Sequence, residues 1–303
     1  MTKAFNTDLQ RRLESFIAEA GSQEKAASLI GYSAATLSTY RKGTYNGDVD
    51  KLENRLRELF VIEKAAEGLH SSLLEYVPTS ISQKVYETIR ICHLKGGLAI
   101  ECGDAGIGKT KAAEKYVADY PNSAIYITVN PCFTSLSSFL KLLCKRLRIS
   151  TGRKDDMWLD IDSYLRGGRK VLIVDEAQHL PIKTIDSIRS FFDANPALGI
   201  IFIGNAETVA CRGGRVRESY SQIRNRTKLT EIRHTTQITR EDMKLLFPAL
   251  ADCKKEIDFL HVIAQSEQGI RGAVNLYSNA VDNENTTYEG LLAMAQTMRI
   301  VNL

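Results

Sequence analysis

The stretch "GDAGIGKT", from Gly103 to Thr110, decides the fold of this 303-residue chain. It satisfies an eight-residue pattern with glycines at Gly103 and Gly108 and with Lys109 and Thr110 at its end. Glycines let backbone amides point inward at phosphate groups, since a Cβ would clash in so tight a turn. The positive end of a following helix adds to the attraction. The stretch therefore predicts a phosphate-binding loop between a strand and a helix.

The sequence on either side of this loop has the alternation that the prediction needs. Four near-continuous apolar runs, "LAIECG", "AIYITV", "KVLIVD" and "GIIFIG", suit strands that are buried on both faces of a parallel sheet. Helical segments such as "KTKAAEKYVADY", "LSSFLKLLCKRL" and "IDSIRSFFD" lie between them. Alternation of this kind predicts βαβ units and an α/β fold with a parallel sheet.

The loop predicts the nucleotide as well as the fold. Lys109 is expected to reach the β- and γ-phosphates, and the Thr110 hydroxyl to coordinate Mg²⁺. The loop predicts ATP or GTP as the nucleotide, and no guanine-specific run such as "NKxD" is present. The predicted ATP-binding residues in this stretch are Gly103, Asp104, Ala105, Gly106, Ile107, Gly108, Lys109, Thr110 and Lys111.

Polar side chains at the ends of two apolar runs complete the predicted site. "KVLIVDEAQHL" places Asp175 at the carboxyl end of a strand, where it would hold Mg²⁺ through water. Glu176 is placed to orient and polarise the attacking water. Asn205, after "GIIFIG", would hydrogen-bond the γ-phosphate or the water. The alternatives are an ordinary acidic strand end and an asparagine that only caps a turn.

An arginine-rich segment follows this strand. An arginine supplied by a neighbouring subunit would neutralise charge on the transferring phosphoryl group. The segment also suits contact with a DNA backbone, or a merely solvated basic face. Its arginines are Arg212, Arg215, Arg217, Arg224 and Arg226.

The N-terminal stretch "LIGYSAATLSTYRKG", residues 29–43, predicts a helix-turn-helix with Gly31 at the turn and the small Ala27 where the helices cross. Ser33 is a plausible N-cap for the second helix. The positions expected to be buried are Ala26, Ile30, Tyr32, Leu37 and Tyr40.

Candidate DNA-contacting residues fall in two places. On the second helix, small hydroxylated side chains would approach a major groove and two cations would hold phosphates. That helix lacks the Arg, Asn or Gln side chains best suited to reading bases, and its alternative use is packing or partner contact. In the core, further basic residues are candidates. The two sets are Thr36, Ser38, Thr39, Arg41 and Lys42, and Lys145, Arg146, Arg148, Arg153 and Lys154.

Composition and patterning set the remaining limits. The net charge of +4 permits nucleic-acid binding without requiring it. No apolar run is long enough to span a membrane, and the charged N-terminus is unlike a signal peptide, so we expect a cytoplasmic protein. The expected domains are a helix-turn-helix domain at 1–65, a linker at 66–82, the α/β core at 83–235 and a helical lid or C-terminal subdomain at 236–303.

Taken together, these motifs resemble those of AAA+ ATPases. The resemblance implies that Asn205 is sensor 1, that Arg224 or Arg226 is the arginine finger, and that Arg271 in "GIRGAVNLY" is sensor 2 and binds ATP. Gln222 stands where an arginine of the finger motif is expected, which leaves the finger assignment open between the two arginines.

The order of domains is similar to that of the B-protein family of bacteriophage Mu, the ATP-dependent target-DNA activators of transposition. The stretches "TYNGD", "YVPTSISQKVYETIR", "TVNPCFTS" and "GNAETV" leading to "GGR" agree in order and spacing. The family implies subunits that self-associate with ATP into a helical filament on double-stranded DNA of nearly any sequence. It also implies delivery of that DNA to a transposase, stimulation of strand transfer, disassembly on hydrolysis, and a bacterial host cytoplasm.

Two other functions fit the same motifs. A helicase loader or replication-initiation ATPase shares the core and the DNA contact, but binds a replicative helicase. An ATP-controlled transcription regulator would use the helix-turn-helix to read an operator, and would bind it about a thousandfold or more tightly than random DNA.

Overall fold

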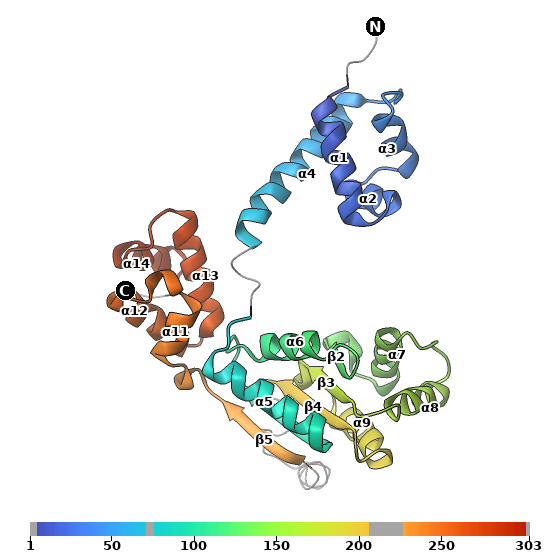
Figure 1. Ribbon diagram of the computed structural model, residues 1–303, viewed down its shortest axis with the longest axis vertical. Helices are drawn as coiled ribbons and strands as arrows, with labels where there is room; N and C mark the ends of the chain where they lie inside the picture. The colour runs from blue at the N-terminus through green and yellow to red at the C-terminus, as the bar shows by residue number, and fades with distance from the viewer. Residues whose placement is uncertain (1–4, 71–75, 206–226, 301–303) are drawn as a thin grey trace. The chain divides into compact units, whose positions relative to one another are not determined.

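The computed structural model describes residues 5–70, 76–205 and 227–300, and the chain divides into two compact units, Met1–Glu75 and Tyr76–Leu303 (Figure 1). The last helix of the first unit, α4 (Val49–His70), runs past residue 65, where the sequence predicted the domain to end. Helix α5 (Ser80–Lys95) begins inside the predicted linker. Within the described residues, no helix is long and apolar enough to cross a membrane.

The N-terminal unit is a bundle of α1 (Thr7–Ala20), α2 (Gln23–Ile30), α3 (Ala34–Arg41) and α4. Side-chain caps start α1, α2 and α3; the Ser33 hydroxyl accepts a hydrogen bond from the Thr36 amide, as predicted. Gly31 ends α2 with φ of 83°, a left-handed conformation that favours glycine. The predicted helix, turn and second helix are therefore present.

The bundle core consists of apolar side chains from all four helices. Four of the five positions predicted to be buried are so: Ala26, Ile30, Leu37 and Tyr40. The fifth, Tyr32, was predicted to be buried but is only half-buried. It directly follows the turn and packs against the edge of the bundle core. At the centre, Tyr40 donates a hydrogen bond to the buried Glu53 carboxylate at 3.0 Å.

The C-terminal unit is built on a five-stranded parallel sheet in the order β2-β3-β4-β1-β5, which confirms the predicted α/β fold. The four apolar runs became β1 to β4, whereas β5 was not foreseen. Its residues alternate between half-buried and exposed up to the buried Arg233, because it forms an edge of the sheet beside β1. The strands are β1 (Gly97–Gly103), β2 (Ala124–Thr128), β3 (Val171–Asp175), β4 (Gly199–Gly204) and β5 (Thr227–Arg233).

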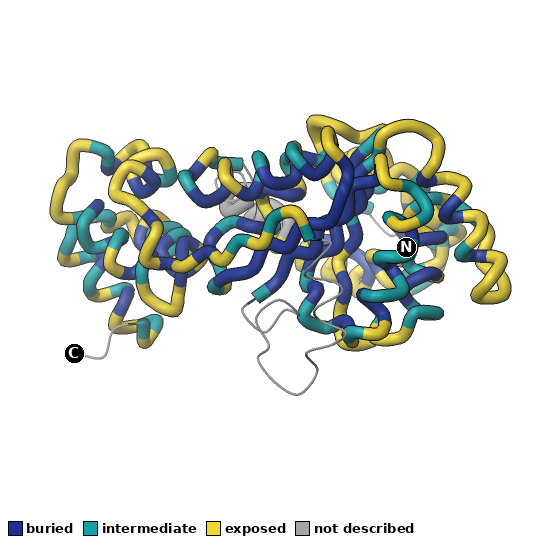
Figure 2. The backbone as a smooth tube through the Cα atoms, turned by 90° about the horizontal axis from the view of Figure 1, so that it is seen from below, coloured by how far each residue is buried: buried dark blue, intermediate teal, exposed yellow. Residues whose placement is uncertain are grey.

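Helices cover both faces of this sheet, and β1 to β4 run between them almost entirely buried (Figure 2). Neighbouring residues of β3 serve opposite faces: Ile173 packs with α5 and α6, and Leu172 packs with α7, α8 and α9. This two-sided burial explains why the strand sequences are continuously apolar. The core helices are α5, α6 (Lys109–Asp119), α7 (Leu136–Leu147), α8 (Lys154–Leu165) and α9 (Ile182–Ala194).

A helical subdomain follows β5 and shares one apolar cluster with α5 and α6. Its first helix is also fastened to α5 by polar contacts: the buried Asp242 carboxylate accepts hydrogen bonds from the Ser80 amide at 2.6 Å and the Ser80 hydroxyl at 2.7 Å. The subdomain and the sheet are therefore held together at the start of α5. Its helices are α11 (Arg240–Leu246), α12 (Lys254–Gln265), α13 (Gly269–Asp282) and α14 (Tyr288–Thr297).

Candidate nucleotide-binding site

The phosphate loop, residues 103–110, joins the end of β1 to the start of α6 at the carboxyl edge of the sheet. A Cβ on Gly103 would lie 2.1 Å from the Arg233 carbonyl oxygen, so no larger residue fits where the loop leaves the strand. Gly108, with φ of 96°, turns the chain into α6. Gly103 therefore allows a close approach to the end of β5, and Gly108 allows the turn into a helix N-terminus, the end of a helix that attracts anions.

Lys109 is almost fully enclosed, with 9% of its surface exposed. Its ammonium donates to the carbonyl oxygens of Gly103 at 3.0 Å and Asp104 at 2.6 Å. Burial lowers the pKa of Lys109, and the nearby carboxylates, Asp175 foremost, oppose that shift. The lysine is thus held at the loop, next to the acidic side chains.

Asp175 lies at the end of β3, 2% exposed, as the centre of a hydrogen-bond cluster. Its Oδ2 accepts from the Thr110 hydroxyl at 2.8 Å and from the Tyr126 hydroxyl at 2.8 Å. Its Oδ1 accepts from the Glu176 amide at 2.9 Å. The structure therefore brings together the two residues predicted to serve Mg²⁺, and adds Tyr126, which sequence reasoning missed.

Tyr126 reaches Asp175 from the neighbouring strand β2, in which Thr128 is the register partner of Asp175. Burial raises the pKa of the Tyr126 hydroxyl, as does the Asp175 charge beside it, so the hydroxyl stays a donor at neutral pH. The only signal in the sequence was a tyrosine within an otherwise aliphatic strand.

The donor set under the loop suits a magnesium ion. A threonine hydroxyl and a carboxylate are hard oxygen ligands of the kind that Mg²⁺ takes beside substrate phosphates. Thr110 and Asp175 are the residues that would hold it, directly or through water. When bound, the ion would neutralise charge on the phosphates.

Glu176 follows Asp175 in a left-handed backbone conformation with φ of 56°. Its Oε2 accepts a hydrogen bond from the side-chain NH₂ of Gln178. The side-chain carbonyl of Gln178 in turn accepts from the backbone amide of Asn205 at 3.4 Å. The two predicted polar positions, Glu176 and Asn205, are thus joined through Gln178, a residue that the sequence analysis did not single out.

Two predicted ATP-binding side chains point elsewhere. Asp104 faces the end of β5, where its amide donates to the Arg233 carbonyl at 3.0 Å and its carboxylate accepts from the Thr235 amide at 2.8 Å. Lys111 pairs with Glu114 at 2.9 Å on the exposed face of α6. Their backbone atoms remain at the loop, because both residues belong to the loop–helix junction.

The α13 N-terminus lies directly on the phosphate loop. The Arg271 amide donates to the Gly106 carbonyl at 3.2 Å, and the Arg271 side chain is exposed. A Cβ on Gly269, which has φ of 64°, would lie 2.6 Å from the Ala105 carbonyl oxygen. The structure therefore brings the backbone of Arg271 to the phosphate loop. The predicted finger residues Arg224 and Arg226, and Arg212, Arg215 and Arg217, lie outside the described residues.

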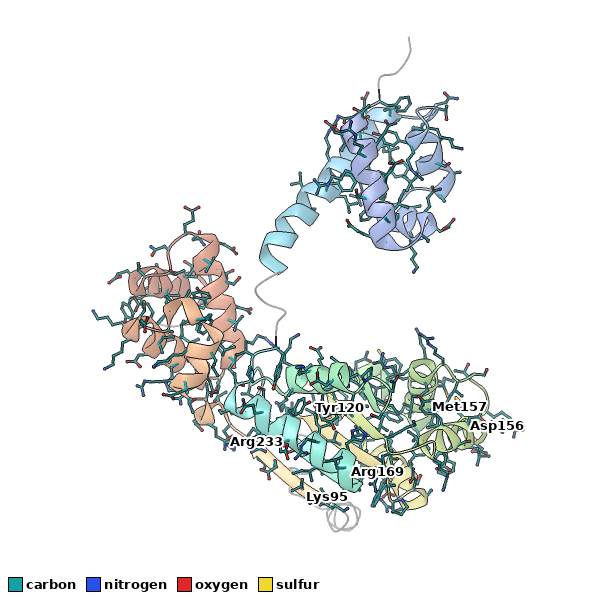
Figure 3. All side chains as sticks on the ribbon, in the orientation of Figure 1. Lys95, Tyr120, Asp156, Met157, Arg169 and Arg233 are labelled. Atoms are coloured by element: carbon teal, nitrogen blue, oxygen red, sulfur yellow. The ribbon has the colours of Figure 1, made fainter. Side chains whose placement is uncertain are left out.

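Beside the loop, a buried ion pair joins β5 to β1. Arg233, at the end of β5 (Figure 3), donates to both carboxylate oxygens of Glu101 at 3.1 and 3.3 Å. Thr88 of α5 donates to the same carboxylate at 2.6 Å. Arg233 therefore holds β5, the strand that was not predicted, next to β1, which leads into the phosphate loop.

Several of the candidate DNA-contacting residues of α3 form hydrogen bonds or ion pairs within the N-terminal unit. Arg41 forms an ion pair with Glu14 at 3.1 Å and also donates to Gln23. The Thr39 hydroxyl donates to backbone carbonyls of its own helix, and the Thr36 hydroxyl bonds that of Ser33. Ser38 is half-buried and Lys42 exposed.

The basic candidates of the core gather on α7 and the turn to α8. Lys145, Arg146, Arg148 and Arg153 are exposed, and no ion pair engages them within the described ranges. Lys154 lies 4.0 Å from Asp155. Lys141, one turn before Lys145 on the same face of α7, is exposed too and was missed.

Comparisons with known proteins agree with this geometry. Residues 93–210 match the AAA domain family. The chain is 24% identical to Mu-like prophage FluMu DNA transposition protein B of Haemophilus influenzae, over 84% of this chain and 90% of that protein. It is 26% identical to ATP-dependent target DNA activator B of Escherichia phage Mu, over 80% of this chain and 77% of that protein.

Among solved structures, Cdc6p of Pyrobaculum aerophilum has a similar fold, with 16% identity and a TM-score of 0.54 over 75% of this chain and 69% of that one. The AAA domain match contains the phosphate loop, Asp175 and Asn205. The chain therefore has an AAA+ fold, and over most of its length it is similar to the DNA transposition protein B and the target DNA activator B of phage Mu.

Proposed function

We propose that this AAA+ ATPase hydrolyses ATP with Mg²⁺ at the phosphate loop, with Lys109 on the phosphates, Thr110 and Asp175 serving the metal, and Glu176 activating water. The observation that supports this most directly is the hydrogen bond from the Thr110 hydroxyl to the Asp175 carboxylate at 2.8 Å, at the end of a loop that has no room for a Cβ at Gly103. Asn205 and Arg271 would sense the γ-phosphate, since both lie at the same edge of the sheet or on the loop itself.

We propose further that ATP-bound subunits assemble into a filament on double-stranded DNA of nearly any sequence. The filament would present that DNA to a transposase and stimulate strand transfer, and DNA and partner would in turn stimulate hydrolysis. Support comes from the relatives, which are named DNA transposition protein B and ATP-dependent target DNA activator B. An arginine from one subunit at the ATP of the next would make assembly depend on the nucleotide, and hydrolysis would loosen it.

The DNA contact of the core is assigned to the basic segment of α7 and the turn to α8, comprising Lys141, Lys145, Arg146, Arg148 and Arg153. These cations are exposed and carry no carboxylate partner among the described residues. Lysine and arginine side chains without a carboxylate partner can bind the phosphates of a DNA backbone. Such contacts do not depend on the base sequence. The segment therefore suits a protein that binds target DNA indifferently.

Electron microscopy on random duplex DNA tests the assembly step. Filaments with ATP, and none with ADP or without nucleotide, are the expected result; no filaments with ATP would contradict the proposal. Lys109→Ala should fail to assemble. Glu176→Gln should bind ATP, hydrolyse it slowly and leave persistent filaments, and rapid turnover by this variant would exclude Glu176 as the residue that activates water.

The helix, Gly31 turn and second helix of the N-terminal unit favour one other function, an ATP-controlled regulator that reads an operator. Competition binding separates the two. A regulator would bind one duplex about a thousandfold more tightly than others. Equal affinity for unrelated duplexes supports the target-DNA role, and retention of a replicative helicase instead of a transposase would indicate a helicase loader.

A further inference from the structure

Gln178 lies between the two polar residues at the carboxyl edge of the sheet. It belongs to the single turn of 3₁₀ helix, Ala177–His179, that follows β3. Its side-chain NH₂ donates to Glu176 Oε2 at 2.5 Å, and its side-chain carbonyl accepts from the Asn205 amide at 3.4 Å. One primary amide thus connects the side chain after β3 with the backbone at the end of β4.

The backbone leaves Glu176 few ways to orient itself. Its left-handed conformation fixes the direction of its Cβ, and its carbonyl accepts from the His179 amide at 3.1 Å, which closes the turn. The Gln178 amide then engages one carboxylate oxygen, so the direction of the other is set as well. A general base must lie within hydrogen-bond reach of the proton that it takes, so such a restraint bears on the rate.

We propose that Gln178 is a positioning residue, which holds the Glu176 carboxylate for the attacking water and couples it to the end of β4. A glutamine is suited to this because it donates with one end and accepts with the other, which neither leucine nor glutamate does. A shift of Asn205 would then reach Glu176 through a single side chain. This inference rests on the proposed role of Glu176.

Turnover of the full-length chain tests the positioning role. Gln178→Leu removes the amide and keeps the length of the side chain. We expect kcat for ATP to fall about tenfold with KM unchanged, because positioning changes and ATP binding does not. Gln83→Leu is the matched control, since it removes a hydrogen-bonded glutamine amide from α5 of the same unit. Gln178→Glu, which cannot donate to Glu176, should lose at least as much.

Hydrogen exchange gives a readout that does not depend on activity. In nucleotide-free protein, the Asn205 amide should exchange severalfold faster in Gln178→Leu than in the wild type or in the Gln83 control. Binding of a fluorescent ATP analogue should stay the same in all three, which shows that the variant is folded. Unchanged exchange together with wild-type kcat would overturn the inference.

A double-mutant cycle separates this inference from the function on which it rests. If Gln178 acts through Glu176, then Gln178→Leu has no further effect on kcat in the Glu176→Gln background. Independent losses that multiply would overturn the positioning role while leaving the proposed function intact. Fast hydrolysis by Glu176→Gln alone would remove the proposed role of Glu176, and the inference with it.

Discussion

At the scale of single residues, the Asp175 carboxylate accepts three hydrogen bonds from the protein, more than binding of a magnesium ion alone requires. The Tyr126 and Thr110 hydroxyls share its Oδ2, and the Glu176 amide takes its Oδ1. Side chains held in this way lose little freedom when a ligand arrives, so the site is preorganised. Tyr126 is the member whose hydroxyl can be removed without changing the shape of the core.

We therefore predict that Tyr126→Phe weakens Mg²⁺-dependent ATP binding about ten- to a hundredfold, the loss expected of one hydrogen bond to a charged group. Titration of a fluorescent ATP analogue at several Mg²⁺ concentrations measures it. Tyr86→Phe is the control, because it removes an equivalent hydroxyl from a carboxylate, Asp119, outside the site. Equal effects of the two variants would show that Tyr126 has no special role.

Gly269 has a similar single-residue importance on the other side of the phosphate loop. With φ of 64° and the Ala105 carbonyl 2.6 Å from the position of a Cβ, alanine would push α13 off the loop. Gly269→Ala should weaken binding of the ATP analogue at least tenfold, while Gly290→Ala, near the start of α14, should leave it unchanged. Wild-type affinity of Gly269→Ala for the ATP analogue would show that the contact between α13 and the phosphate loop is not needed for binding.

At the scale of elements, α11 is attached to α5 through Asp242. Burial alone would raise the pKa of this carboxyl, but hydrogen bonds from Thr239 and Ser80 hold it below its ordinary value. Because the folded-state pKa is the lower one, the bonds contribute their full stability above the unfolded-state pKa of about 4, and lose it as the pH falls through the folded value.

Asp242→Asn should thus lower the free energy of unfolding by about 1–3 kcal/mol near pH 7, since an amide cannot accept at both ends. The difference between the two proteins should shrink as the pH falls from 5 to 3. Urea unfolding at each pH measures both quantities, with Asp252→Asn, an exposed carboxyl of the same subdomain, as the control. A difference that stays constant with pH would contradict this account.

Comparison by element shows what a sequence makes predictable. The loop, Asp175 and the four buried strands were found because each depends on a local pattern of glycines or apolar residues. Strand β5 was missed because it is an edge strand that is mostly half-buried or exposed, so its sequence contains no apolar run. Tyr126 and Gln178 escaped for a different reason: their roles depend on strand register and on a 3₁₀ turn, which bring together residues 49 and 27 positions apart.

At the scale of the whole molecule, the chain has two compact units, and each has an apolar core of its own. Two independent cores predict two unfolding transitions in calorimetry. ATP with Mg²⁺, bound at the proposed site in the second unit, should stabilise one transition, by about 2.7 kcal/mol at a hundredfold excess over Kd. The Glu176→Gln variant avoids hydrolysis during the scan, and Lys109→Ala should remove the shift. A common shift of both transitions would contradict this.

DNA affinity is also a property of the whole molecule, and salt reports on it. Replacing Lys145, Arg146 and Arg148 with alanine should reduce the slope of log K against log salt by about 2–3, since each phosphate contact contributes about 0.9. Replacing three exposed lysines of the lid changes the net charge equally and should leave the slope nearly unchanged; they are Lys244, Lys254 and Lys255. Identical slopes for both variants would remove the basic segment from the DNA interface.

The placement of β5 has a mechanical consequence. The strand pairs with β1 in parallel, from Thr227 to Arg233, and its last residue is hydrogen-bonded to Asp104 of the phosphate loop. The arginine-rich segment joins β5 at its N-terminal end. A force applied there along the strand would act in shear on all the backbone hydrogen bonds between β5 and β1 at once, and not on one bond after another. Force from that segment would therefore reach the phosphate loop before β5 separates from β1. The strand would transmit force between the arginine-rich segment and the phosphate loop.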